Sequence, residues 1–139
     1  MKHEGRLIVT VDNLEYAKTV TSVSGYLSVY ADASLPALTS IGGGMYVYAD
    51  ASLFALTSVG GRLSVRASAS LRAPNAVIYG EKWTEIAESC YVMFRSESGR
   101  YMAGCRGPFT AAEALKHWNR SDERARVFTA AIKKAEGMV

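Results

Sequence analysis

A segment of 13 residues occurs twice in the chain, 18 residues apart. Residues 31–43 read ADASLPALTSIGG and residues 49–61 read ADASLFALTSVGG, so 11 of the 13 positions are identical. A weaker form of the same period extends to both sides as an apolar residue, a variable residue and a valine. These segments are Val9-Thr10-Val11, Leu27-Ser28-Val29, Met45-Tyr46-Val47 and Leu63-Ser64-Val65. A short repeat in several copies is typical of solenoid proteins.

A finer period of six residues lies within this repeat. A lone strand would show a period of two and a helix a period of 3.6, so neither explains the spacing. Three anchors in 18 residues predict a coil with three flattened sides, stacked on parallel copies of itself about 4.8 Å away. The anchors, all aliphatic, are Val11, Ala17, Val23, Val29, Leu35, Ile41, Val47, Leu53, Val59, Val65, Leu71 and Val77.

The period also predicts which side chains stack on one another in adjacent coils. The expected columns are Val29 with Val47 and Val65, Leu35 with Leu53 and Leu71, and Ile41 with Val59 and Val77. The glycine pairs Gly42-Gly43 and Gly60-Gly61 are expected at corners, because glycine tolerates backbone angles that other residues avoid.

Part of the repeat resembles leucine-rich repeats and receptor-L domains. The segment Met45-x-Val47-x-x-Asp50-x-x-Leu53 is similar to the family core L-x-L-x-x-N-x-x-L, with aspartate in place of asparagine. Leu35, Leu38 and Ile41 resemble the segment that follows that core.

The six-residue spacing also resembles the left-handed hexapeptide β-helix, although glycine follows the anchor only at Gly42 and Gly60. Both resemblances cover roughly residues 7–77, and both imply a parallel β-solenoid. The handedness stays open.

The C-terminal third has a different pattern. Residues 89–96 and 100–107 are strand-like runs, and the Ser98-Gly99 pair between them predicts a tight hairpin. With that pair as a two-residue turn, one inward face would carry Cys90, Val92, Phe94, Tyr101, Ala103 and Cys105.

Two helices are expected after the hairpin. Thr110 and Glu113 form the pattern of a capping box, followed at helical spacing by Ala111, Ala114, Leu115 and Trp118. A second helix is expected from Ser121, with Phe128, Ile132 and Ala135 on one stripe. The predicted fold is α+β, a short parallel β-solenoid of 18-residue coils (residues 1–77) capped by a β-hairpin and two helices (residues 78–139).

Composition narrows the classes of protein. No stretch approaches about 20 apolar residues, and the apolar run from Leu7 to Val11 is too brief for a signal peptide, so we expect a cytoplasmic protein. Residues 1–77 contain 6 basic and 5 acidic side chains, and residues 78–139 contain 10 and 8. Neither part has the concentrated positive charge of a dedicated DNA-binding module.

Candidate catalytic residues are few. Hexapeptide-repeat folds often belong to acyltransferases, which use a histidine as general base, but the two histidines here, His3 and His117, lie outside the predicted coils. Cys90 and Cys105 are expected in the core. Asp32 and Asp50 align in adjacent coils and are expected to accept hydrogen bonds in turns. We therefore expect no catalytic, cofactor-binding or metal-binding residues.

Arginines in the C-terminal part raise a nucleic-acid alternative. Acidic residues at Glu97, Asp122 and Glu123 are interleaved with them, which favours a mixed, solvated surface. The arginines are Arg95, Arg100, Arg106, Arg120, Arg124 and Arg126.

The most informative predicted surface lies between the inward anchors. Two outward columns are expected, one of Thr10, Ser28, Tyr46 and Ser64 and one of Asp12, Tyr30, Tyr48 and Arg66. Tyrosine and arginine on a rigid sheet suit protein recognition, although aromatic columns also stabilise stacked strands. The predicted partner-binding residues are Tyr26, Tyr30, Tyr46, Tyr48 and Arg66.

The run from Arg100 to Trp118, RYMAGCRGPFTAAEALKHW, resembles segments of small accessory proteins of phages and prophages. The resemblance implies a phage-encoded protein in a bacterial cytoplasm, where such proteins often inhibit host defences such as CRISPR systems. The expected function is a non-enzymatic protein-binding module, with inhibition of a defence complex in the manner of an anti-CRISPR protein as its implied role. An acyltransferase and a nucleic-acid-binding accessory protein stay as alternatives, and no feature indicates the oligomeric state.

Overall fold

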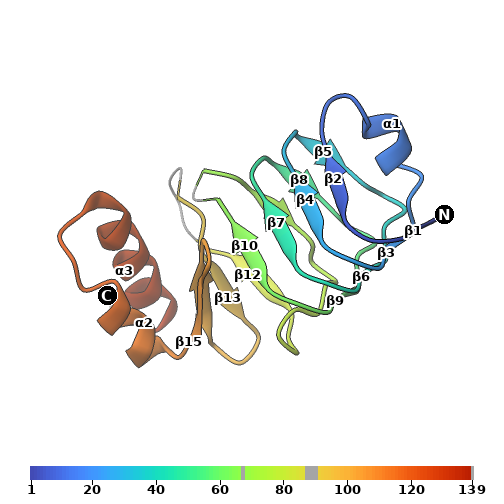
Figure 1. Cartoon of the computed structure of the whole chain (residues 1–139). Helices are drawn as coiled ribbons and strands as arrows, with labels where there is room; N and C mark the ends of the chain where they lie inside the picture. The colour runs from blue at the N-terminus through green and yellow to red at the C-terminus, as the bar shows by residue number, and fades with distance from the viewer. Residues whose placement is uncertain (67, 87–90, 139) are drawn as a thin grey trace.

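The chain forms a three-sided parallel β-solenoid followed by an antiparallel sheet and two helices (Figure 1). This computed structural model describes residues 1–66, 68–86 and 91–138. Each side of the solenoid is a sheet of short strands from successive coils, with four strands in the first and second sides and three in the third. The first side contains β1 (Lys2–His3), β3 (Ser22–Val23), β6 (Ser40–Ile41) and β9 (Ser58–Val59). The second contains β2 (Leu7–Val9), β4 (Leu27–Val29), β7 (Met45–Val47) and β10 (Leu63–Val65), and the third β5 (Ala33–Ser34), β8 (Ala51–Ser52) and β11 (Leu71–Arg72).

The central coils follow the predicted 18-residue register. Val29 pairs with Val47 and Val47 with Val65, in each case between parallel strands. Ile41 pairs with Val59 in the same way. The three-sided parallel stacking inferred from the six-residue period is therefore confirmed in these coils.

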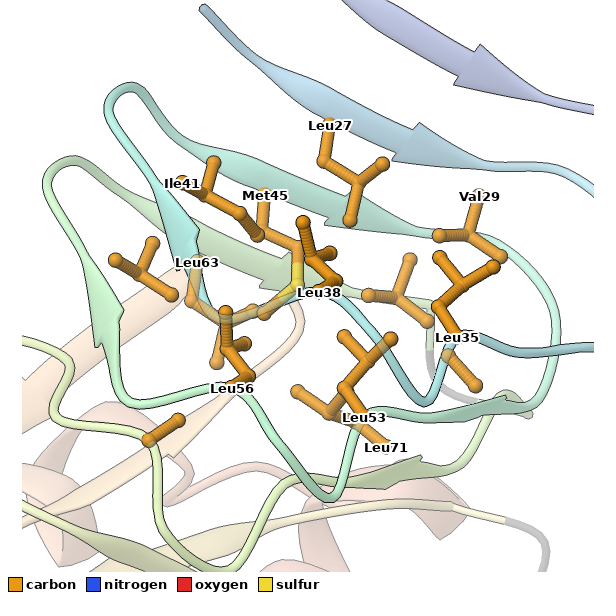
Figure 2. Close-up of a cluster of buried hydrophobic side chains, with 14 of the residues drawn as sticks. Leu27, Val29, Leu35, Leu38, Ile41, Met45, Leu53, Leu56, Leu63 and Leu71 are labelled. Atoms are coloured by element: carbon orange, nitrogen blue, oxygen red, sulfur yellow. The ribbon is translucent and has the colours of Figure 1, made fainter. Parts of the chain in front are cut away.

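The interior is a stack of aliphatic side chains that converge from the three sides (Figure 2). In each three-residue strand of the second side, alternation turns the first and third side chains inward, so Met45 and Val47 are buried and Tyr46 lies outside. Leu38 and Leu56 supply a further inward position in the turn after the third side. At a corner, Gly42 and Gly60 approach so closely that a Cβ at Gly60 would clash with the Gly42 carbonyl oxygen.

The first coil departs from the predicted register by two residues. Val9 pairs with Val29, 20 residues away, and the predicted anchor Val11 is 74% exposed. A short helix, α1 (Leu14–Ala17), lies in this coil and lengthens it. Leu7, Val9 and Val11 are apolar at every second position, so either Leu7 and Val9 or Val9 and Val11 could have formed the inward pair of the strand.

The last coil departs as well. Leu71 was predicted to stack on Leu53, but it pairs with Ala51. The reason is that the stretch from Val65 to Leu71 is two residues longer than the equivalent stretch from Val47 to Ala51. At the end of this coil Ala76 and Ile78 are buried, whereas the predicted anchor Val77 is exposed and pairs with Ser58 in place of Val59.

The C-terminal cap is a four-stranded antiparallel sheet, in the order β12-β13-β14-β15, followed by two helices. The predicted hairpin is its centre. The cap elements are β12 (Trp83–Glu85), β13 (Phe94–Ser96), β14 (Tyr101–Ala103), β15 (Arg106–Phe109), α2 (Ala111–His117) and α3 (Glu123–Ala135). The amide of Val65 donates to the carbonyl of Gly104 over 3.1 Å, which joins β10 to the cap.

The hairpin register differs from the prediction by one residue. Phe94 pairs with Met102, and the Ser96 amide donates to the Arg100 carbonyl, so the turn has three residues, 97–99. Gly99 in this turn has a φ of +88°, which favours glycine. Because a one-residue shift exchanges the two faces of a strand, the single inward face predicted for Phe94, Tyr101 and Ala103 is wrong.

Both faces of the cap sheet are buried. Trp83, Phe94 and Met102 join the solenoid core. Met93, Tyr101 and Ala103 pack with the helices in a second core. Cys105 is exposed, which contradicts the predicted inward position, and Cys90 lies outside the described residues.

The helices confirm most of the sequence reading. Thr110 and Glu113 form the reciprocal hydrogen bonds of a capping box at the start of α2. The second helix is capped by Asp122, one residue after the predicted Ser121, and Phe128 and Ile132 are buried. Ala135, expected on the same stripe, is exposed because it lies at the last residue of α3. No helix in the described part of the chain is long and apolar enough to span a membrane.

Candidate partner-binding surface

The predicted site residues come together on the second side of the solenoid. We call Tyr26, Tyr30, Tyr46, Tyr48 and Arg66 the tyrosine row. Tyr46 is the middle residue of β7, and Tyr30, Tyr48 and Arg66 directly follow β4, β7 and β10. The Tyr48 amide donates to the Val29 carbonyl over 2.9 Å and the Arg66 amide to the Val47 carbonyl over 2.8 Å, so equivalent positions stack coil upon coil.

The tyrosines form two contacting pairs. The rings of Tyr30 and Tyr48 stack with centroids 4.7 Å apart and planes 9° from parallel. The rings of Tyr26 and Tyr46 lie 6.0 Å apart at 51°. Tyr26, Tyr30 and Tyr48 are exposed by 51%, 55% and 41%, whereas Tyr46 is half-buried. The predicted outward orientation is therefore confirmed for the three exposed rings, and Arg66 is also exposed.

Stacking between coils determines what these rings present to solvent. The centroid separation of Tyr30 and Tyr48 equals the spacing of adjacent strands, so the ring planes lie across the solenoid axis. Their faces point along the axis, and their edges and hydroxyl groups point outward. The pair Tyr30 and Tyr48 thus presents ring edges to solvent, because the two ring faces that meet are covered.

The first-coil members of the predicted columns need correction. Ile8, and not Thr10, pairs with Ser28. The Tyr30 amide donates to the Val9 carbonyl, which places Thr10 and not Asp12 next to Tyr30 in the second column. Both changes follow from the two-residue shift of the first coil.

A groove that sequence reasoning missed begins where the tyrosine row ends. Its volume is about 720 Å³, and Tyr48 and Arg66 lie at its solenoid side. Three more arginines line its cap side, Arg106 from β15, Arg120 from the connection between the helices and Arg124 from α3. No acidic residue is among the described residues that line it. We call this the arginine groove.

Five of the six arginines considered from the sequence divide into two groups, and the sixth, Arg126, lines a different pocket. Arg95 forms an ion pair with Glu136 at 3.2 Å within the cap, and Arg100 forms one with Glu81 at 2.6 Å between the end of the solenoid and the hairpin. Arg106, Arg120 and Arg124 line the arginine groove. No local signal in the sequence links them to Arg66, because they come from separate elements.

The two histidines have different surroundings. His3 is engaged at both ring nitrogens, Nδ1 with the Tyr16 hydroxyl at 2.8 Å and Nε2 with the Arg6 carbonyl at 2.9 Å. The ring of His117 lies 4.9 Å from both Phe109 and Trp118. Burial, and then the positive charges of Arg106 and Arg120, lower the pKa of His117, which favours its neutral form.

The aspartates predicted to bond in turns connect adjacent coils. Oδ1 of Asp32 accepts from the Asp50 amide over 3.0 Å, and Oδ1 of Asp50 accepts from the Ser70 amide over 2.9 Å. Within residues 1–66, 68–86 and 91–138, no group of three or more His, Cys, Asp or Glu side chains is arranged to hold a metal ion.

Comparisons of the chain with protein-family models, curated proteins and solved structures find no match.

Proposed function

We propose that the chain is a non-enzymatic binding module that recognises a protein partner through the tyrosine row. The observation that carries the proposal is the stacked, exposed pair Tyr30 and Tyr48 on the central coils. Tyrosine and arginine are enriched among the residues that contribute most to binding energy in protein interfaces.

The backbone beneath the row supports this proposal. Strand β4 is hydrogen-bonded to β2 on one side and to β7 on the other. Strand β7 is hydrogen-bonded to β4 and β10 in the same way. Side chains held on such a scaffold lose little conformational entropy on association, so more of their contact energy appears as affinity.

The test compares two double variants. Tyr30→Ala/Tyr48→Ala removes the stacked pair, and Phe54→Ala/Val11→Ala removes exposed apolar side chains elsewhere on the solenoid. Partners captured from a bacterial lysate are identified by mass spectrometry, purified and titrated against each protein. We expect at least tenfold weaker binding by the tyrosine variant, since truncating a central anchor costs about 2 kcal/mol or more. Unchanged affinity in a folded tyrosine variant would refute the proposal.

The finer proposal is that the partner belongs to a bacterial defence complex. Its support is the resemblance of Arg100–Trp118 to segments of phage and prophage accessory proteins. The direct test is phage plaque formation on a bacterium with an active CRISPR system, with and without the expressed chain. Plaque counts that rise with the wild type and not with Tyr30→Ala/Tyr48→Ala would support the inhibitor role, and equal counts in all strains would count against it.

A further inference from the structure

The fold gathers positive charge in the arginine groove. Arg66 follows a solenoid strand, Arg106 lies in the cap sheet, and Arg120 and Arg124 lie in or beside α3. These positions are up to 58 residues apart in sequence, yet all line one groove of about 720 Å³. His117 lines the same groove, and burial, followed by the positive charges of Arg106 and Arg120, lowers its pKa.

The described side chains balance little of this charge. Arg120 has an ion pair with Asp122 at 3.2 Å, but both side chains are 52% exposed, so the pair is worth little. The guanidinium of Arg124 lies over the Tyr91 ring at 5.6 Å. No ion pair involves Arg66 or Arg106 among the described residues. An anionic ligand would supply the missing counter-charge.

We propose that the arginine groove binds an acidic segment of the protein partner, with aspartate or glutamate carboxylates paired to Arg66 and Arg106. This inference rests on the proposed function, because Tyr48 and Arg66 belong to both surfaces. The partner would contact the tyrosine row with a folded surface and place the acidic segment in the groove. Arginine suits this role because its planar fork binds a carboxylate through two hydrogen bonds.

The aromatic residues of the groove favour a peptide over a nucleic acid. Single-stranded nucleic acids bind by stacking bases on open aromatic faces. Here Trp118 and Phe128 are buried, one face of Tyr48 is covered by Tyr30, and Arg124 lies over Tyr91. The described groove therefore offers several guanidinium groups but, at Tyr48, one uncovered ring face, which is too little for stacking successive bases.

The experiment uses the full chain and a fluorescein-labelled glutamate-rich peptide, with binding followed by fluorescence anisotropy. The groove variant is Arg66→Ala/Arg106→Ala. The matched control, Arg6→Ala/Arg62→Ala, removes the same charge from two exposed arginines outside the groove. We expect the groove variant to bind at least tenfold more weakly and the control to stay within about twofold of the wild type, because only the groove variant loses charge-assisted hydrogen bonds to the carboxylates. Binding by the wild type should also weaken as salt rises.

Three outcomes would overturn the proposal: no measurable binding of the peptide, equal weakening in both variants, or tighter binding of a single-stranded DNA of the same net charge that is lost in the groove variant. The last outcome would assign the groove to nucleic acid.

The purified partner separates this proposal from the proposed function. If it binds the groove variant at full affinity but not Tyr30→Ala/Tyr48→Ala, the acidic-segment proposal fails and the proposed function stands. If it binds the tyrosine variant at full affinity, the proposed function fails, and the peptide titration still decides whether the groove binds carboxylates.

Discussion

Met93 and Phe94 are neighbours in the chain, yet their side chains are buried in two different hydrophobic cores. Phe94 packs with the solenoid interior and Met93 with the helices. The cap sheet is thus a shared wall, which closes the solenoid on one face and supports α2 and α3 on the other. Because both cores share this sheet, a destabilising substitution on either face is expected to lower the stability of both the solenoid and the helical part.

Phe94→Ala tests this shared wall. Phe94 is 4% exposed, and replacing a buried phenylalanine by alanine costs about 3–5 kcal/mol through lost contacts and a cavity. We expect urea unfolding, followed by circular dichroism and by tryptophan fluorescence, to shift to lower urea by the same amount with both probes. Phe54→Ala, at an exposed position, should change stability by less than about 0.5 kcal/mol. Two separate transitions would show that the cap and the solenoid unfold independently.

Val47→Asp and Val11→Asp form a matched pair, because both valines are anchors of the six-residue period but only Val47 is buried. An aspartate at position 47 would place a charge among aliphatic side chains with no partner, so we expect loss of the folded state. An aspartate at position 11 should leave the circular dichroism spectrum and the melting temperature nearly unchanged. A folded Val47→Asp protein would contradict the described packing of the coil interior.

The period predicted the solenoid well wherever the repeat is strict. Between Leu27 and Val65, the register, the three sides and the buried anchors follow from spacing, since each coil copies the previous one. The buried Leu38 and Leu56 lie outside the six-residue period. The prediction failed at both ends, where α1 and the stretch after Val65 change the coil length. Near each change in coil length, apolar residues recur at more positions than the coil can turn inward. The pattern alone therefore could not show which of them are buried.

The candidate site shows the same division. The tyrosine row was predictable, because its members lie in strict coils and alternation fixes their side. The arginine groove was not, because it depends on how the cap docks against β10. Its docking contact, Val65 to Gly104, joins residues with no shared pattern. The one-residue error at Glu97 likewise exchanged the faces of the hairpin, and so hid the double-sided sheet.

His117→Ala addresses the packing and titration of the groove wall. Loss of contacts to Phe109 and Trp118 should lower the unfolding free energy by about 1 kcal/mol at pH 8. The pKa of His117 is lowered in the folded protein, so the unfolded chain takes up the proton first as pH falls through 6.5. As pH falls towards 5.5, the unfolding free energy of the wild type should therefore decrease more than that of His117→Ala. The difference between the two proteins should become smaller. A gap that widens towards low pH in urea titrations would contradict this environment for His117.

Glu81→Gln tests an ion pair that connects the solenoid end to the hairpin. Hydrogen bonds from Ser98, and then from Arg100, hold the pKa of Glu81 at about 2, below its ordinary value of 4.5, despite the opposing effect of burial. The Ser98 amide donates to Oε1 over 2.8 Å and the Arg100 Nε to Oε2 over 2.6 Å. A depressed carboxylate pKa stabilises the fold above pH 4.5, and this contribution disappears as pH falls towards 2. The wild type should therefore be more stable than Glu81→Gln at pH 6, and the difference should shrink steadily between pH 4.5 and 2.

The matched control is Glu4→Gln, because Glu4 is an exposed carboxylate at the opposite end of the solenoid. It should track the wild type across the whole pH range in urea unfolding experiments. The difference in unfolding free energy between the wild type and Glu81→Gln could instead stay constant from pH 6 to pH 2.5. Glutamate and glutamine at position 81 would then differ only in packing. The charge on Glu81 would then contribute nothing to the connection between residues 79–81 and the turn at 97–99.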